Sequence, residues 1–124
     1  MIAALLLASS VPADFPKAAS VTIAQVRADP RAWDGKWVRF DGYIDRCSRL
    51  SCHVAAQPGD AKMTLSFDSS DSFDEWIGPQ LPARVQVTAR IDSTCLIGFC
   101  TDRAPELRLF YVDVLTANLP NGIE

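Results

Sequence analysis

The segment at 37–45 constrains the fold of this chain more than any other, because it alternates like a strand and carries a glycine on its apolar face. Val38, Phe40 and Ile44 fall on one face of an extended chain, and charged residues fall on the other. Gly42 lies on the apolar face, between Phe40 and Ile44. A glycine at such a position commonly marks a bulge or a sharp bend, which is how a strand turns the corner of a barrel. The segment therefore predicts a bent strand of a small β-barrel.

Four further runs of apolar residues predict strands. They lie at 52–57, 63–67, 84–91 and 106–115, and a turn joins the first two into a hairpin. In the last run the residues at 109–112 are all apolar, which indicates burial on both faces or a β-bulge. The chain is thus expected to contain five strands.

Two sequence motifs predict short helices. Thr22 followed by Gln25 matches a capping box, which places a helix directly before the first strand. Ser72 followed by Glu75 matches a second capping box, between the third and fourth strands. The second helix is expected to bury Trp76 together with other apolar side chains.

The order of these elements is characteristic of one architecture. Five strands with a helix between the third and the fourth is the order of an OB-fold, a partly open Greek-key barrel. A chain of 124 residues, 48% of them hydrophobic, is long enough for one such domain with its own core. We therefore expect an all-β, five-stranded OB-fold barrel over residues 21–117, with a short helix at its N-terminus.

Two stretches of sequence, TIAQVRADP at 22–30 and DGKWVRFDGYI at 34–44, carry a resemblance to a known family. They resemble the opening of small exported bacterial OB-fold proteins, a largely uncharacterised family. In that family a short helix ending in Asp-Pro leads into a first strand with the pattern Gly-Lys-x-Val-x-x-x-Gly. The likeness is strong over the first half of the mature chain and loose over 84–115. It implies the fold and export, and it implies no reaction.

The first residues of the chain have features of an export signal. An apolar run at 2–8 is followed by small residues, and Val11 and Ala13 suit the positions before a secretory cleavage site. We interpret residues 1–13 as a signal peptide and 14–20 as a tether; the alternative is a short apolar element packed on the domain. The run is too short to cross a membrane. The expected location is the periplasm or the outside of the cell, and residues 118–124 are expected to form a loose tail.

Four cysteines form two equally spaced pairs, Cys47 with Cys52 and Cys95 with Cys100. On the expected layout they lie in the loops that join the first two and the last two strands, and these loops flank the usual ligand face of an OB-fold. An oxidising location favours a disulfide within each loop. Disulfides between the loops, a zinc site of four cysteines and a redox-active pair are the alternatives.

Three arginines lie in or beside the cysteine loops and can form a local positive patch for an anionic ligand. Together with Tyr43, which is expected on an outer strand face, Arg46, Arg49 and Arg103 make the candidate ligand-binding set. The alternative is that these arginines are solvated loop charges. His53 is the only histidine, and it is expected to face away from its neighbour Cys52, which disfavours a Cys-His nucleophile.

Charge and motifs weigh against several classes of function. The net charge is -3, the wrong sign for a domain that grips nucleic acid over its whole surface. No phosphate-binding loop, histidine-bearing metal motif or placed pair of carboxylates occurs in the sequence. We therefore expect a non-catalytic binding or interaction module of the cell envelope that needs no cofactor. Its partner is expected to be an envelope protein or a small anionic ligand. A thiol-redox or zinc protein is the alternative, and single-stranded nucleic-acid binding, an analogy of fold alone, is a further one.

Overall fold

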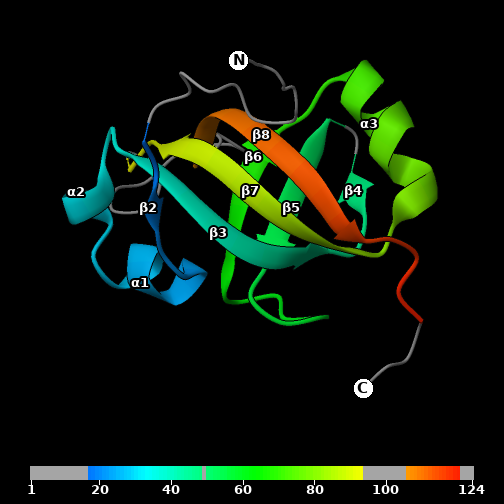
Figure 1. Cartoon of the computed structure of the whole chain (residues 1–124), viewed down its shortest axis with the longest axis horizontal. Helices are drawn as coiled ribbons and strands as arrows, with labels where there is room; N and C mark the ends of the chain where they lie inside the picture. The colour runs from blue at the N-terminus through cyan, green and yellow to red at the C-terminus, as the bar shows by residue number, and fades with distance from the viewer. Residues whose placement is uncertain (1–16, 49, 94–105, 121–124) are drawn as a thin grey trace, which may run out of the picture.

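Five strands close into a barrel in the structure, a computed structural model that describes residues 17–48, 50–93 and 106–120 (Figure 1). These strands are β3 (Trp37–Ile44), β5 (Ser51–Ala55), β6 (Thr64–Asp68), β7 (Ala83–Ile91) and β8 (Leu107–Thr116). Around the barrel they follow the order β3, β7, β8, β6, β5, and a contact between β3 and β5 closes it. Strands β6 and β8 run parallel, and the other neighbours run antiparallel. The expected all-β OB-fold barrel is confirmed.

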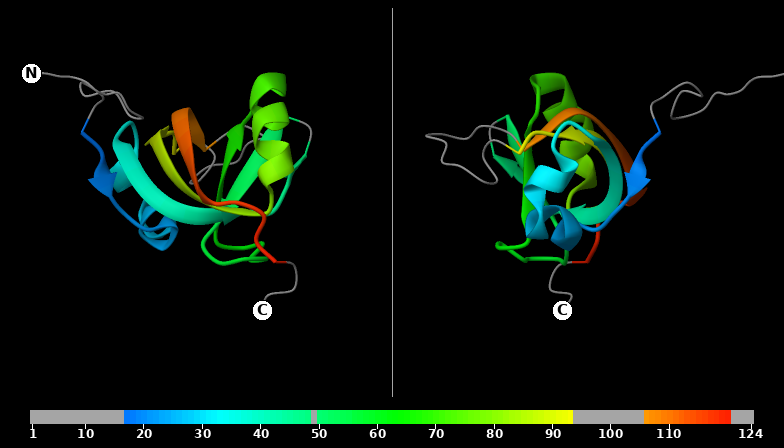
Figure 2. Two further views of the ribbon diagram at one scale, coloured as in Figure 1. Left: turned by 45° about the vertical axis from the view of Figure 1, so that its right-hand side comes forward. Right: turned by 90° about the vertical axis from the view of Figure 1, so that its left-hand side faces the viewer.

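Short elements extend this barrel at both ends of the sheet. Strand β2 (Ala19–Ser20) pairs parallel to β3, within the segment expected to be a tether, and β4 (Cys47–Ser48) pairs with β5. The helical elements are α1 (Ile23–Ala28), α2 (Pro30–Trp33), α3 (Asp71–Ile77) and the 3₁₀ turn η1 (Gly78–Gln80). In Figure 1 and in the left view of Figure 2, α1 and α3 lie on opposite sides of the barrel. No helix of the described ranges has the length and apolar character needed to span a membrane.

The sequence predicted the start of α1 correctly and the start of α3 incorrectly. Thr22 and Gln25 form the expected capping box, in which each side chain accepts a hydrogen bond from the backbone N–H of the other, at 3.0 and 2.8 Å. The N-cap of α3 is Ser70, whose Oγ accepts from the N–H of Phe73 at 3.1 Å. The expectation of Ser72 as this cap is wrong. Ser70 has the extended backbone that an N-cap needs, whereas Ser72 already lies inside the first turn.

Helix α3 closes one end of the core with only part of its expected apolar face. Ile77 is fully buried, and the ring of Phe73 packs edge-on against Phe67 with the centroids 5.5 Å apart. Trp76 remains 49% exposed, so its expected burial is wrong. Phe73 and Ile77 are four residues apart and share the inner face, while Trp76 lies about 100° around the helix from Ile77.

Gly42 marks the place where the barrel closes. Strand β3 is curved (Figure 2), and its pairing with β7 runs without a break from Trp37 to Ile44, so it contains no bulge towards β7. A Cβ atom on Gly42 would lie 2.5 Å from Cγ1 of Val54 and 2.9 Å from the carbonyl oxygen of Ala55. The glycine is therefore required for the close approach of β5 to β3. Register shifts occur instead between β7 and β8, in agreement with the irregular pattern of the last strand.

Candidate functional site

A hollow of about 370 Å³ lies on the outer face of the barrel where β3 meets β5. Ile44 and Val54 are fully buried, so the residues that alternate with them, Tyr43 and His53, face outward. We call this the β3–β5 hollow, and its polar or aromatic lining side chains are Tyr43, Asp45, Arg46, His53, Asp60 and Thr64.

The floor of the β3–β5 hollow is a row of residues across three strands. Tyr43 of β3 pairs with Ala55 of β5, and Ala55 pairs with Thr64 of β6. Ala55 faces outward like His53 but is only 7% exposed, because it lies beneath the larger side chains around it. A methyl group in the middle of the row leaves the space that the hollow occupies.

One wall of the hollow is the connection between β5 and β6, where Asp60 has a defined state of charge. Its Oδ1 accepts hydrogen bonds from the backbone N–H groups of Lys62, at 2.9 Å, and Met63, at 3.1 Å. These bonds, first that from Lys62 and then that from Met63, lower the pKa of the Asp60 carboxyl. Asp60 is therefore an anion at neutral pH, fixed at the edge of the hollow by its own loop.

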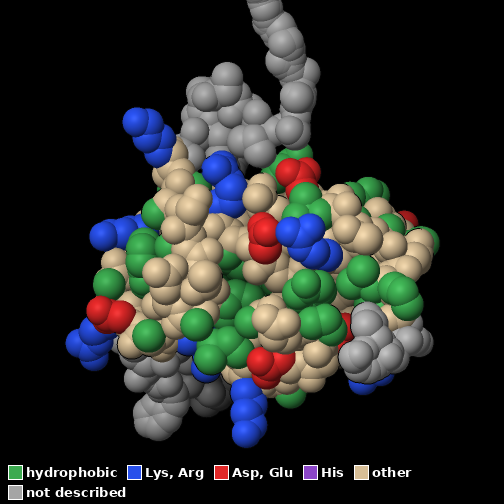
Figure 3. Space-filling view, turned by 60° about the horizontal axis from the view of Figure 1, so that its bottom comes forward, with side chains coloured by type: hydrophobic (Ala, Val, Ile, Leu, Met, Phe, Trp, Pro, Cys, Tyr) green, Lys and Arg blue, Asp and Glu red, His purple; other side chains and the backbone are tan. Residues whose placement is uncertain are grey.

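The hollow contains both acidic and basic side chains, and these are not paired with one another. Within the described part of the chain, the side chains of Asp45, Arg46 and His53 form no hydrogen bond or ion pair. Figure 3 shows the lower side of the barrel, where acidic and basic side chains are interspersed around hydrophobic ones; no histidine is visible on this face, so the His53 side of the hollow is not in view. In the coloured part of this face neither sign forms a continuous patch. The described residues of the site thus offer both hydrogen-bond donors and acceptors to a small polar ligand, and among them there is no extended cationic track for a polyphosphate.

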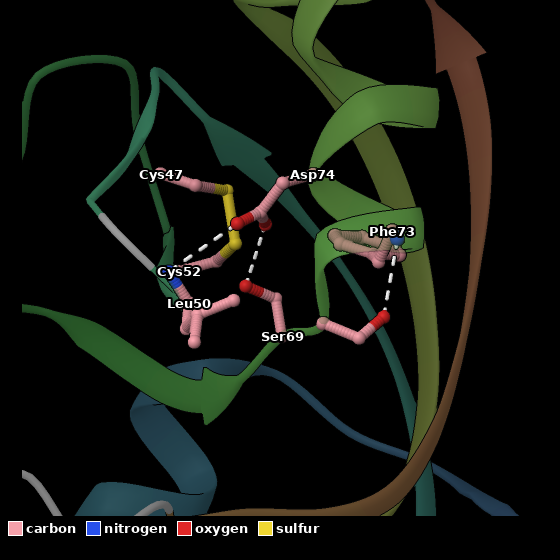
Figure 4. The surroundings of a disulfide bond; sticks show 7 residues. Cys47, Leu50, Cys52, Ser69, Phe73 and Asp74 are labelled. Atoms are coloured by element: carbon pink, nitrogen blue, oxygen red, sulfur yellow. Dashed lines mark hydrogen bonds between the residues drawn. A yellow bond between two sulfur atoms is a disulfide. The ribbon is translucent and has the colours of Figure 1, made fainter.

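A disulfide connects β4 to β5 beside the hollow's Arg46 and His53 (Figure 4). Cys47 of β4 and Cys52 of β5 are direct cross-strand partners, so the expected local pairing of these two cysteines is confirmed. They belong to paired strands and not to an open loop, because the hairpin continues to the pair Ser48 and Ser51. Arg46 directly precedes Cys47, and His53 directly follows Cys52. The disulfide therefore limits how far these two side chains can move apart.

The tip of this hairpin is anchored to the start of α3. Asp74 accepts a hydrogen bond from the N–H of Leu50 at 3.2 Å and another from the hydroxyl of Ser69 at 2.6 Å (Figure 4). The N–H of Ser69 donates in turn to the carbonyl of Leu50 at 2.9 Å. The end of the hairpin is thus held at both its cysteines and its turn.

The disulfide also bears on metal binding. The sulfur atoms of Cys47 and Cys52 and a carboxylate oxygen of Asp74 lie within 4.8 Å of one another. The sulfurs are joined, however, and zinc is bound by thiolates. In this oxidation state the set does not supply the ligands of a zinc site.

The structure brings together two of the four residues of the candidate ligand-binding set. Tyr43 and Arg46 line the same hollow, whereas Arg49 and Arg103 lie outside the described residues, as do Cys95 and Cys100. The sequence did not single out Asp60 or Thr64, because their place beside Tyr43 depends on the closure of the barrel. The Pro-Gly-Asp turn at 58–60 was the available signal for Asp60.

Comparisons of the chain with protein-family models, with curated proteins and with solved structures found no match. The function must therefore be inferred from the site itself.

Proposed function

We propose that the protein is an exported, non-catalytic OB-fold module of the cell envelope that binds a small polar ligand in the β3–β5 hollow. The observation that carries the proposal is that Tyr43 and Arg46 share one hollow with His53, Asp45 and Asp60. Its volume of about 370 Å³ falls within the range of small-molecule sites, roughly 300–1,000 Å³. An aromatic ring beside groups that both donate and accept hydrogen bonds is the usual composition of such sites.

The charges of the hollow define the chemistry of the ligand. Arg46 has no ion-pair partner among the described residues and is suited to an anionic group. Asp45 and Asp60 would repel a second anionic group nearby, and they accept hydrogen bonds from hydroxyl or amine groups. A ligand with one carboxylate or phosphate and several hydroxyl groups satisfies both demands.

Two observations support the remaining parts of the proposal. Cys52 is fully buried in a disulfide while His53 faces solvent, so these neighbours do not form a nucleophile and base. The Cys47–Cys52 disulfide is the form expected in an oxidising compartment, which supports export.

The proposal can be tested by NMR titration with glucuronate, a sugar with one carboxylate, and with glucose as its neutral match. His53 is the only histidine of the chain, so its imidazole signals report on the hollow without ambiguity. We expect glucuronate to shift these signals and the amide of Tyr43, and glucose to have a much weaker effect. Replacing Arg46 by Gln should weaken binding about tenfold or more, the value of one charged hydrogen bond.

Arg31 provides a matched control, because it is an exposed arginine of α2 that does not line the hollow. Arg31→Gln should bind glucuronate like the wild type. The proposal is wrong if the His53 signals do not respond to glucuronate, or if Arg46→Gln and Arg31→Gln bind it equally well.

A further inference from the structure

A second hollow adjoins the β3–β5 hollow on the outer face of β3. It has a volume of about 400 Å³ and lies between the segment Ser20–Ala24, the middle of β3 and the start of the β5–β6 connection. We call it the β2–β3 hollow. Asp41 lines this hollow and Tyr43 lines the other. These residues are two positions apart on β3, which corresponds to about 7 Å along an extended strand. The β5–β6 connection contributes Gln57 to one and Asp60 to the other, so the two hollows are neighbours.

Both charged side chains of the β2–β3 hollow make contacts within the protein, but only Asp41 has an oppositely charged partner. Asp41 forms an ion pair with Arg84 at 3.1 Å and accepts a hydrogen bond from Gln86 at 3.3 Å. The Nε of Arg39 donates to the hydroxyl of Thr88 at 3.2 Å. Arg84 thus compensates the charge of Asp41, whereas the guanidinium of Arg39 keeps its charge and has one N–H engaged by a neutral hydroxyl. The other polar groups that line the hollow are hydroxyl, amide and backbone groups.

The edge of β3 adds backbone groups to the same hollow. The pairing of β2 with β3 ends where the carbonyl of Arg39 accepts from the N–H of Val21 at 3.0 Å, and the pairing with β5 begins at Tyr43. No described strand pairs with Asp41 along this edge. Alternate residues direct their backbone groups to the same edge of a strand, so the N–H and C=O of Asp41 point to the gap.

We propose that the two hollows form one binding groove for an acidic oligosaccharide, with an acidic unit in the β3–β5 hollow and a neutral unit in the β2–β3 hollow. This inference rests on the proposed function and specifies its ligand. Hydroxyl and amide groups of a neutral sugar match the uncharged polar lining around Asp41, and a uronate carboxylate matches Arg46.

The same observations disfavour two other extended ligands. An oligonucleotide carries a negative charge on every unit, whereas the groove contains Asp41, Asp45 and Asp60 and holds Arg39 in an internal hydrogen bond. An added peptide strand needs a run of open backbone groups. The gap on β3 offers those of Asp41 alone, because the neighbouring positions Arg39 and Tyr43 are paired.

The test compares glucuronate with the hyaluronan disaccharide, in which glucuronate is joined to the neutral sugar N-acetylglucosamine. We expect the disaccharide to bind the full chain roughly tenfold more tightly, a gain equivalent to one or two additional hydrogen bonds. It should shift the amide signals of Ala24 and Gln57 in addition to the signals of His53 and Tyr43, whereas glucuronate should shift only those of His53 and Tyr43.

Two exposed alanines of α1 provide the blocking variant and its control. Ala24 lines the β2–β3 hollow and Ala28 does not. Ala24→Leu should abolish the advantage of the disaccharide and leave glucuronate binding unchanged, and Ala28→Leu should alter neither.

If the disaccharide and glucuronate bind with equal affinity, the groove is wrong while the proposed function stands. If neither shifts the His53 signals, both are wrong. Tighter binding of an oligothymidylate or of a short polyalanine peptide across both hollows would refute the assignment to an oligosaccharide.

Discussion

Replacing Gly42 by Ala should destabilise the barrel at its point of closure. The added methyl group would lie 2.5 Å from Cγ1 of Val54 and 2.9 Å from the carbonyl oxygen of Ala55. Neither group can simply turn away, because Val54 is fully buried and the carbonyl belongs to the backbone of β5. The substitution therefore has to push β5 away from β3.

The magnitude follows from two opposing terms. Overpacking of a filled core costs about 1–3 kcal/mol, and two fixed contacts place Gly42→Ala near the upper end. The lower conformational entropy of alanine in the unfolded chain offsets about 0.4–1 kcal/mol. We expect the free energy of unfolding to fall by about 2 kcal/mol, which lowers the melting temperature of a domain of this size by roughly 8–16 °C.

Urea unfolding followed by tryptophan fluorescence measures this change, since the chain has three tryptophans. Gly78→Ala is the comparison variant: apart from its chain neighbours, a Cβ atom there has no neighbour within 4 Å, and the backbone is right-handed helical with φ at -47°. The lower entropy of the unfolded chain favours alanine at this position, and the following Pro79 disfavours a Cβ in this conformation, so we expect Gly78→Ala to change stability by less than about 1 kcal/mol. Hydrogen exchange at the amide of Ala55 should accelerate in Gly42→Ala more than in Gly78→Ala. Equal stability of the two variants would refute the role given to Gly42.

Three further predictions concern the hairpin, α3 and the loop beside the hollow. Replacing Cys47 and Cys52 together by Ala should lower the free energy of urea unfolding by about 2 kcal/mol, which is the entropic contribution expected for closing a six-residue loop. Unchanged stability of this variant would contradict the prediction. Ser70→Ala should lower that free energy by about 1 kcal/mol through loss of the N-cap, whereas Ser72→Ala should change it by less than about 0.5 kcal/mol. A larger loss of stability in Ser72→Ala than in Ser70→Ala would instead identify Ser72 as the N-cap. The Asp60 carboxyl should titrate by NMR below its ordinary pKa of 3.8. The ionised Asp60 carboxylate therefore contributes its full stabilisation above its unfolded-state pKa, and this stabilisation is lost as the pH falls through the lower folded-state pKa. The free energy of unfolding of Asp60→Asn should consequently fall less on acidification than that of the wild type.

The local elements could be predicted from the sequence where one residue pattern allowed one structure. The alternation at 37–45 specified β3 and its inward face, and Thr22 with Gln25 specified the start of α1. The start of α3 was less determined, because serines occur at 69, 70 and 72, and each can accept a backbone hydrogen bond. Ser69 is engaged by Asp74, which leaves Ser70 as the cap.

Features that depend on contacts between distant segments could not be predicted in the same way. The exposure of Trp76 follows from the orientation of α3 over the barrel, which places Phe73 and Ile77 inward. Tyr43 was identified as an aromatic residue on an outer strand face, and Arg46 as an arginine beside the first cysteine loop. Asp60 joins them only because β3 and β5 come together, and no local pattern encodes that contact.

The position of the hollow at the barrel's closure has a thermodynamic consequence. One residue pair, Tyr43 with Ala55, joins β3 to β5, whereas the pairing of β3 with β7 extends over the whole of β3. Local opening is therefore expected to begin between β3 and β5. A ligand that contacts Tyr43 on one side and His53 on the other binds only the closed form, so it stabilises this junction by mass action. The close approach at Gly42 and the Cys47–Cys52 disulfide make opening between β3 and β5 less frequent in the unliganded protein. Less of the binding free energy is then needed to close the junction, so both features favour affinity without contacting the ligand.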